Sequence, residues 1–197
     1  MGKPEITRKN IIQAYVKLAK ENGPSNVTVR EICEEAGISK NTFYLYFHNR
    51  DEVFGETYYA DDDEKASRFP QIMLEYDSPL EQFWELLKID IERHLSFGPK
   101  LLATISMQNV SQIQFFTEDP EEQPESVKVF TSLVRKMQRM GEIQNMSNPF
   151  DIVKGVYLIA VGLDIRWTQM DGDFDFKKES FEMLKMLLQP TREISNY

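Results

Sequence analysis

Four polar or aromatic residues stand close together near the start of a short helical segment: Lys40, Asn41, Thr42 and Tyr44. An ammonium group, an amide, a hydroxyl and a phenol supply several hydrogen-bond donors and acceptors at one place. Asparagine can pair with adenine through two hydrogen bonds, whereas lysine suits phosphate or guanine. These residue types at this spacing are typical of a surface that binds nucleic acid.

The residues around this cluster predict two short helices joined by a tight turn. Thr28 can cap the first helix, and Glu31 three residues later completes a capping box. Gly37 can adopt the left-handed conformation that ends a helix, and Ser39 can cap the second helix. Apolar residues at helical spacing give the first helix one inward face: Val29, Ile32, Cys33 and Ala36.

Two aromatic residues fix the inner side of the second helix. Phe43 and Phe47 lie four residues apart and are expected to point inward. A helix-turn-helix sends the first residues of its second helix to base edges. The other interpretation is an αα-hairpin of any helical domain, but caps, glycine and aromatic spacing agree on the helix-turn-helix. A preceding helix over residues 4–22 should cover the pair and complete a three-helix head.

The sequence Gly-Ile-Ser-Lys-Asn-Thr-Phe-Tyr-Leu-Tyr-Phe over residues 37–47, followed by His-Asn-Arg-Asp-Glu-Val-Phe, closely resembles the DNA-binding segment of the TetR family of transcriptional regulators. The resemblance covers about residues 5–55, and very little of it extends beyond them. It implies a double-stranded DNA operator and a second copy of the chain as partners. It also implies a small hydrophobic effector bound by the body of the protein.

The resemblance further implies which residues contact DNA. Arg30 and Asn41 are the expected base readers, while most of the others should hold phosphate or sugar. Many family members carry a small residue where Asn41 stands. Arg50 would face a phosphate at a helix start, whereas His48 fits a contact or a solvated loop equally well. The full expected set is Thr28, Arg30, Ser39, Lys40, Asn41, Thr42, Tyr44, Tyr46, His48 and Arg50.

The charge of the chain is divided unevenly between its two parts. The net charge of −9 over 197 residues would by itself argue against nucleic acid. Residues 1–50 carry eight Lys or Arg against five Glu, a net +3, and residues 51–197 carry fifteen against twenty-seven acids, a net −12. A basic head on an acidic body can bind phosphate locally.

Composition predicts a protein of the cytoplasm that crosses no membrane. No apolar run approaches the roughly 20 residues that a membrane helix needs, and the N-terminal ten residues are polar. The single cysteine, Cys33, excludes an internal disulfide and lies on the inward face of its helix. We expect it to be a small buried apolar residue rather than a redox sensor.

The rest of the chain predicts an all-α fold, with a three-helix head on a larger helical bundle and about nine helices altogether. The expected domains are residues 1–48, which bind DNA, and residues 49–197, which bind an effector and dimerise. Helix four is expected from a cap at Asn49 to about Ser67, with a break at Phe69-Pro70. Later helices should start at Ser78-Pro79 and Asn148-Pro149, with a stop at Gly98-Pro99 and a loop over residues 118–125.

No pattern for catalysis, a metal or a cofactor is found in the sequence. A glycine-rich phosphate loop, a Cys/His zinc spacing and a His-Glu-x-x-His motif are all missing. The two histidines, His48 and His94, fall in different predicted domains, which disfavours a histidine-centred triad. The chain is therefore not expected to be an enzyme.

The body is predicted to hold an effector pocket and a dimer interface. Core packing alone would also explain both sets of residues. The pocket candidates are aromatic or apolar: Tyr58, Phe83, Trp84, Leu87, Met107 and Phe116, with Phe115 and Met137 nearby. The interface candidates combine small and large apolar residues on the last two helices: Gly155, Ala160, Gly162, Leu163, Phe181, Leu184 and Leu188. A regulator controlled by a protein partner, an activator, or a helical protein-binding adaptor are the alternatives to an effector-released repressor.

Overall fold

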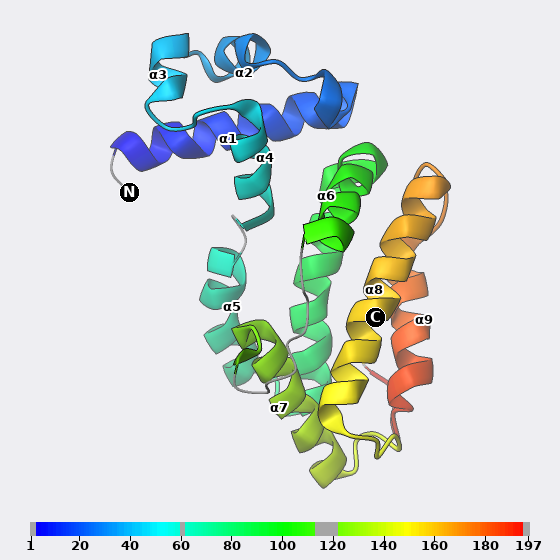
Figure 1. Ribbon diagram of the computed structural model, residues 1–197. Helices are drawn as coiled ribbons and strands as arrows, with labels where there is room; N and C mark the ends of the chain where they lie inside the picture. Colours follow the sequence, from blue (N-terminus) through cyan, green and yellow to red (C-terminus); the bar gives the residue numbers. More distant parts are fainter. Residues whose placement is uncertain (1–2, 60–61, 113–121, 195–197) are drawn as a thin grey trace.

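The computed structural model describes residues 3–59, 62–112 and 122–194, and the regular structure within these ranges consists of helices joined by turns and loops (Figure 1). The predicted all-α fold is confirmed. The elements in order are α1 (Lys3–Asn22), the 3-10 turn η1 (Pro24–Asn26), α2 (Val29–Ala36), α3 (Lys40–Tyr44), α4 (Arg50–Tyr59), α5 (Asp62–Glu75), α6 (Pro79–Gln112), α7 (Glu125–Met140), α8 (Pro149–Gln169) and α9 (Phe176–Leu188).

The first three helices form a head whose core is made of large apolar side chains. Ile11 and Tyr15 of α1 are almost completely buried, as are Ile32 of α2 and Phe43 and Phe47 at α3. The Phe43 and Phe47 rings lie 5.9 Å apart, as their four-residue spacing predicted. Figure 1 shows α2 and α3 on the side of α1 that faces away from the body. The head therefore presents its short helices outward.

Local signals set the boundaries of the short helices, as predicted. Thr28 and Glu31 form the reciprocal capping box at the start of α2. Gly37 ends α2 in the left-handed region with φ 65°, which a residue with a Cβ rarely adopts. The Ser39 hydroxyl accepts a hydrogen bond of 3.1 Å from the backbone N–H of Thr42 and so caps α3.

The segment after the head departs from the prediction. We expected one helix to about Ser67 and a break at Phe69-Pro70, and the expected break was wrong. The structure has α4 up to Tyr59 and then α5, which continues through Pro70 to Glu75. A proline inside a helix removes one N–H donor and does not always end the helix. Ile72 beyond it is buried against the rest of the protein, which supports the last turns.

The body is a bundle of α6, α7, α8 and α9, which stand side by side in Figure 1. Its core contains edge-to-face aromatic pairs, with the Phe83 and Phe130 rings 4.9 Å apart and the Trp84 and Phe181 rings also 4.9 Å apart. The predicted break at Gly98 is present as a kink within α6, because Gly98 has φ 72° and ψ 165°.

The segment after α9 is tied to the loop between α7 and α8. The Glu142 carboxylate accepts a hydrogen bond of 2.9 Å from the backbone N–H of Leu80 and another of 3.3 Å from Arg192. Ile143 and Pro190 form an isolated antiparallel bridge. Glu142 is buried, so these partners compensate its desolvation. This contact closes one end of the bundle.

Candidate DNA-binding surface and effector region

The start of α3 presents an exposed polar surface. Lys40, Asn41 and Tyr44 are exposed, and Tyr44 rests edge-to-face on the buried Phe43 with the ring centroids 5.4 Å apart. Thr42 is half-buried, and its hydroxyl lies 2.9 Å from that of Ser39. Ser39 and Thr42 therefore use their hydroxyls mainly in the cap, while the ammonium, amide and phenol groups remain available for recognition.

Thr28 and Arg30, at the start of α2, differ in how strongly their side chains are bound within the chain. Thr28 accepts from the backbone N–H of Glu31, and its hydroxyl also lies 2.7 Å from the Glu31 carboxylate. The hydrogen bonds from Thr28 hold the pKa of the Glu31 carboxyl below its usual value. Arg30 has a side chain 72% exposed and only a loose ion pair of 3.4 Å with Glu34. Such exposed pairs are weak, so Arg30 can leave Glu34 for a base or phosphate.

At the start of α4, the structure gives Arg50 internal partners. Its guanidinium donates to the backbone carbonyls of Ser25 and Val27, at 3.0 and 3.3 Å, and to the Asp51 carboxylate at 2.8 Å. Arg50 therefore ties α4 to η1, and its phosphate contact stays a prediction.

The residues between α3 and α4 are placed partly as predicted. Asn49 caps α4, since its side chain accepts from the backbone N–H of Glu52 at 2.8 Å. The Glu52 carboxylate in turn accepts a hydrogen bond from the backbone N–H of His48. His48 itself is exposed and Tyr46 is half-buried.

One residue of this surface was not predicted. Leu45 lies at the end of α3 with 81% of its surface exposed. An apolar side chain at a DNA-binding surface can contact the methyl group of thymine. Its position between two tyrosines of the exposed segment was the available signal.

The residues that form this surface match a known family. Residues 11–57 match the family model described as bacterial regulatory proteins, tetR family. Over these residues the chain is similar to the TetR family. The match includes every one of the predicted DNA-contact residues, and the resemblance inferred from the sequence is thereby confirmed. Proteins of this description are regulators rather than enzymes.

A curated relative matches about half of the chain. The fatty acid metabolism regulator protein of Bacillus subtilis (strain 168) is 30% identical over 104 residues, which are 52% of this chain and 52% of that protein. The chain thus matches about half the length of this relative.

Solved structures share the fold over nearly the whole chain. Thermus thermophilus FadR, a TetR family transcriptional repressor in complex with lauroyl-CoA, superposes with a TM-score of 0.63 at 16% identity, covering 95% of this chain and 96% of that one. The fatty acid degradation regulator FadR from Bacillus halodurans superposes with a TM-score of 0.63 at 19% identity, covering 98% and 99%. These likenesses establish the TetR-type fold for the head and the body together.

The predicted effector residues around Trp84 form a closed core. Trp84 is 2% exposed, and Phe83 and Leu87 are buried as well. The space beside Trp84 holds only about 10 Å³, which is no more than one water molecule requires. Tyr58, Met107 and Phe116 lie outside the residues whose side chains the structure describes. This space is too small for an effector, and the pocket predicted around Trp84 stays a prediction.

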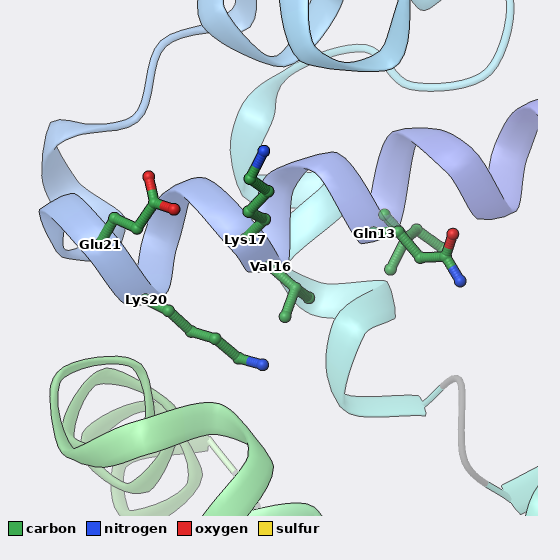
Figure 2. A pocket seen from close by; sticks show the side chains of 6 residues that line it. Gln13, Val16, Lys17, Lys20 and Glu21 are labelled. Atoms are coloured by element: carbon green, nitrogen blue, oxygen red, sulfur yellow. The ribbon is translucent and has the colours of Figure 1, made fainter.

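A larger hollow lies along α1, on the side where the head meets the body. Its volume is about 480 Å³. It is lined by Ile12, Gln13, Val16, Lys17, Lys20 and Glu21. Figure 2 shows Lys17 turned toward α2 and Lys20 pointing away from it, toward α6. All of these lining residues belong to α1, and the groove was not predicted from the sequence.

The predicted interface residues divide into core and surface. Leu163, Phe181, Leu184 and Leu188 are buried within the chain itself, and Gly155 packs against Leu187. These residues pack inside one chain, where Phe181, for example, lies against Trp84 of α6. Ala160 is half-buried and Gly162 exposed, so they stay candidates. The outer faces of α8 and α9 also expose large apolar side chains, namely Leu158, Ile165 and Met186.

The described residues hold neither a group of His, Cys, Asp and Glu suited to a metal nor a helix long and apolar enough for a membrane. Cys33 is buried, as predicted, and burial raises the pKa of its thiol.

Proposed function

We propose that this protein is a cytoplasmic transcriptional repressor that binds a palindromic operator as a homodimer. The observation that carries the proposal is the exposed surface of Lys40, Asn41 and Tyr44 on a helix whose other side is anchored by buried Phe43. A helix of five residues offers few base contacts. Two heads related by a two-fold axis would read two half-sites about 34–36 Å apart, or slightly more.

The dimer part of the proposal is supported by the outer face of α8 and α9. Leu158 is 69% exposed and Met186 is 63% exposed. Gly162 lies on the same helix as Leu158, and a Cβ added to it would have no neighbour within 4 Å among the described residues. Small and large apolar groups together on a surface favour contact with a matching surface. A second copy of the chain offers the same residues, as a two-fold interface requires.

We propose further that a fatty acyl-CoA releases the protein from DNA. The support comes from the relatives, one of which is a fatty acid metabolism regulator and another a repressor in complex with lauroyl-CoA. A ligand shifts the population toward the arrangement that it binds more tightly. A coupling of about 1–3 kcal/mol between effector and operator is the usual range.

The experiment is a gel shift with DNA from upstream of the protein's own gene, at stated salt, with a scrambled duplex of equal length as control. We expect tighter binding to the upstream DNA, and release by dodecanoyl-CoA but not by free coenzyme A. Equal binding to both duplexes would refute the sequence-specific regulator. Specific binding that dodecanoyl-CoA leaves unchanged at saturation would refute only the effector. Light scattering that shows a monomer at micromolar concentration would refute the dimer.

A further inference from the structure

Arg8 of α1 contacts α4 and the residues that follow α3, which are both distant from it in sequence. Its guanidinium makes a two-pronged ion pair with the Glu56 carboxylate of α4, in which Nε lies 2.8 Å from Oε2. It also donates a hydrogen bond of 3.1 Å to the backbone carbonyl of Tyr46, just after the recognition helix α3. The same group lies over the Phe47 ring, 4.6 Å from its centroid. One side chain of α1 thus contacts both α4 and the residues that follow α3.

The environment of Arg8 is that of a structural contact rather than a solvated charge. The Arg8 and Glu56 side chains are only 39% and 33% exposed. The hydrogen bond to Glu56 raises the pKa of the guanidinium above its already high value, against the opposing effect of burial. Arginine suits this position because its planar fork can bond a carboxylate with two N–H groups and still donate elsewhere. From the sequence alone, an arginine here would be interpreted as a phosphate contact or a solubilising charge, and this geometry supports neither.

We propose that Arg8 is a positioning residue that fixes the recognition helix to α4, so that a movement of α4 is transmitted to α3. This inference rests on the proposed DNA-binding function. Tyr46 and Phe47 follow α3 directly, and the Phe43 and Phe47 rings pack against one another beneath the exposed surface. Glu56 lies well inside α4, beyond the capped start of that helix at Asn49. The Arg8 contact therefore spans the point where the head meets the helix that leads to the body.

A second ion pair in the head provides a matched control. Lys17 of α1 pairs with Glu35 of α2 at 2.7 Å. This pair also joins α1 to a neighbouring helix, and Glu35 is exposed to the same degree as Glu56, 33%. The pair links α1 to α2, whereas the Arg8 pair links α1 to α4 and to the end of the α3 segment. Glu35→Gln and Glu56→Gln each remove one negative charge from the chain and keep the side-chain shape.

The experiment compares the operator affinity of full-length wild type, Glu56→Gln and Glu35→Gln on the same DNA and at the same salt. Loss of negative charge alone predicts slightly tighter binding for both variants. Because a hydrogen bond to a charged group is among the stronger ones, we expect Glu56→Gln to bind about tenfold more weakly. Glu35→Gln should bind as wild type or slightly better. Equal affinities of the two variants would overturn the proposal.

Hydrogen exchange followed by mass spectrometry provides a readout that a general loss of stability would not reproduce. In Glu56→Gln, exchange should speed up in the amides of residues 40–48 and in α4, and remain unchanged in α2. A uniform increase across the head, in step with the thermal midpoint, would show a merely stabilising ion pair and overturn the proposal. If wild type bound no DNA, the proposed function would fail, whereas the exchange pattern would still test the link between Arg8 and α3.

Discussion

The head and the body of this protein use aromatic side chains in opposite ways. In the head, Phe43 and Phe47 belong to the buried core, and Tyr44 and the polar residues of α3 project outward from it. In the body, Trp84 and Phe181 pack on one another and leave space for about one water molecule. A recognition surface needs side chains placed outside a core, and a few adjacent residues can specify it. An effector site needs a void, which depends on how whole helices are spaced.

The largest expected effect is a loss of stability in the head that leaves the body nearly unchanged. Phe43→Ala should cost about 3–5 kcal/mol, because a fully buried aromatic residue leaves a cavity in the small core of the head. DNA binding should be lost. Both tryptophans lie in the body, in α6 and α8, so tryptophan fluorescence reports mainly on the body. Chemical unfolding followed by fluorescence should then show a transition close to that of wild type, unless the two parts unfold as one unit.

A smaller effect should appear only at high pH and only in the head. Burial raises the pKa of Tyr15 to about 12, from 10.0. The folded state favours the neutral phenol, so its contribution is complete below pH 10 and is lost as the pH rises toward 12. The expected loss is about 3 kcal/mol from the two-unit shift. Urea unfolding at about pH 9 and about pH 11.5, on either side of the unfolded pKa, should show a larger decrease for wild type than for Tyr15→Phe. An equal decrease in the free energy of unfolding for wild type and Tyr15→Phe would show that Tyr15 does not cause the loss.

Base recognition by α2 is the next test of the outward surface. Arg30→Ala should cost about 1–3 kcal/mol of operator affinity and relax the sequence preference. Little stability should be lost, since the Arg30 side chain is 72% exposed and its ion pair is loose. Competition with specific and scrambled duplexes measures both effects. Equal weakening on the two duplexes would show that Arg30 contacts only the DNA backbone.

The smallest effects concern the two glycines of α8. A Cβ at Gly155 would lie 3.2 Å from Leu187 of the same chain, whereas among the described residues nothing lies within 4 Å of one at Gly162. Alanine favours a helix over glycine by about 0.5–1 kcal/mol. Gly162→Ala should therefore stabilise the monomer, and Gly155→Ala should change it little because the close contact offsets the gain. If light scattering showed that Gly162→Ala weakens a dimer, Gly162 would be placed in the interface.

The sequence predicted those features that depend on neighbouring residues. Caps at Thr28, Ser39, Asn49, Ser78 and Asn148 are all present as hydrogen bonds. Gly37 and Gly98 break the helical path as expected. The family resemblance and the outward placement of Lys40 and Asn41 were also predicted correctly.

Features that depend on distant residues were not predicted. The backbone carbonyls that Arg50 bonds lie 23 to 25 residues away, and the hydrogen-bond partners of Arg8 lie 38 to 48 residues away. Leu184 and Leu188 looked equally suitable for a second chain and for the chain's own core, because periodicity identifies an apolar face but not what covers it. The continuation of α5 through Pro70 likewise depends on packing rather than on local preference.

The segment that follows α9 closes the bundle by bonding residues about fifty positions earlier, as when Thr191 donates to the carbonyls of Glu142 and Gly141. A protease that trimmed the chain back to Leu188 would leave every described helix intact. It would nevertheless remove Arg192 from the buried Glu142, whose other oxygen holds the first turn of α6. The protein would then carry a half-satisfied buried charge at the base of its longest helix. A few residues without regular structure thus hold the end of the bundle together. A shortened chain would be degraded more easily than its helix content suggests.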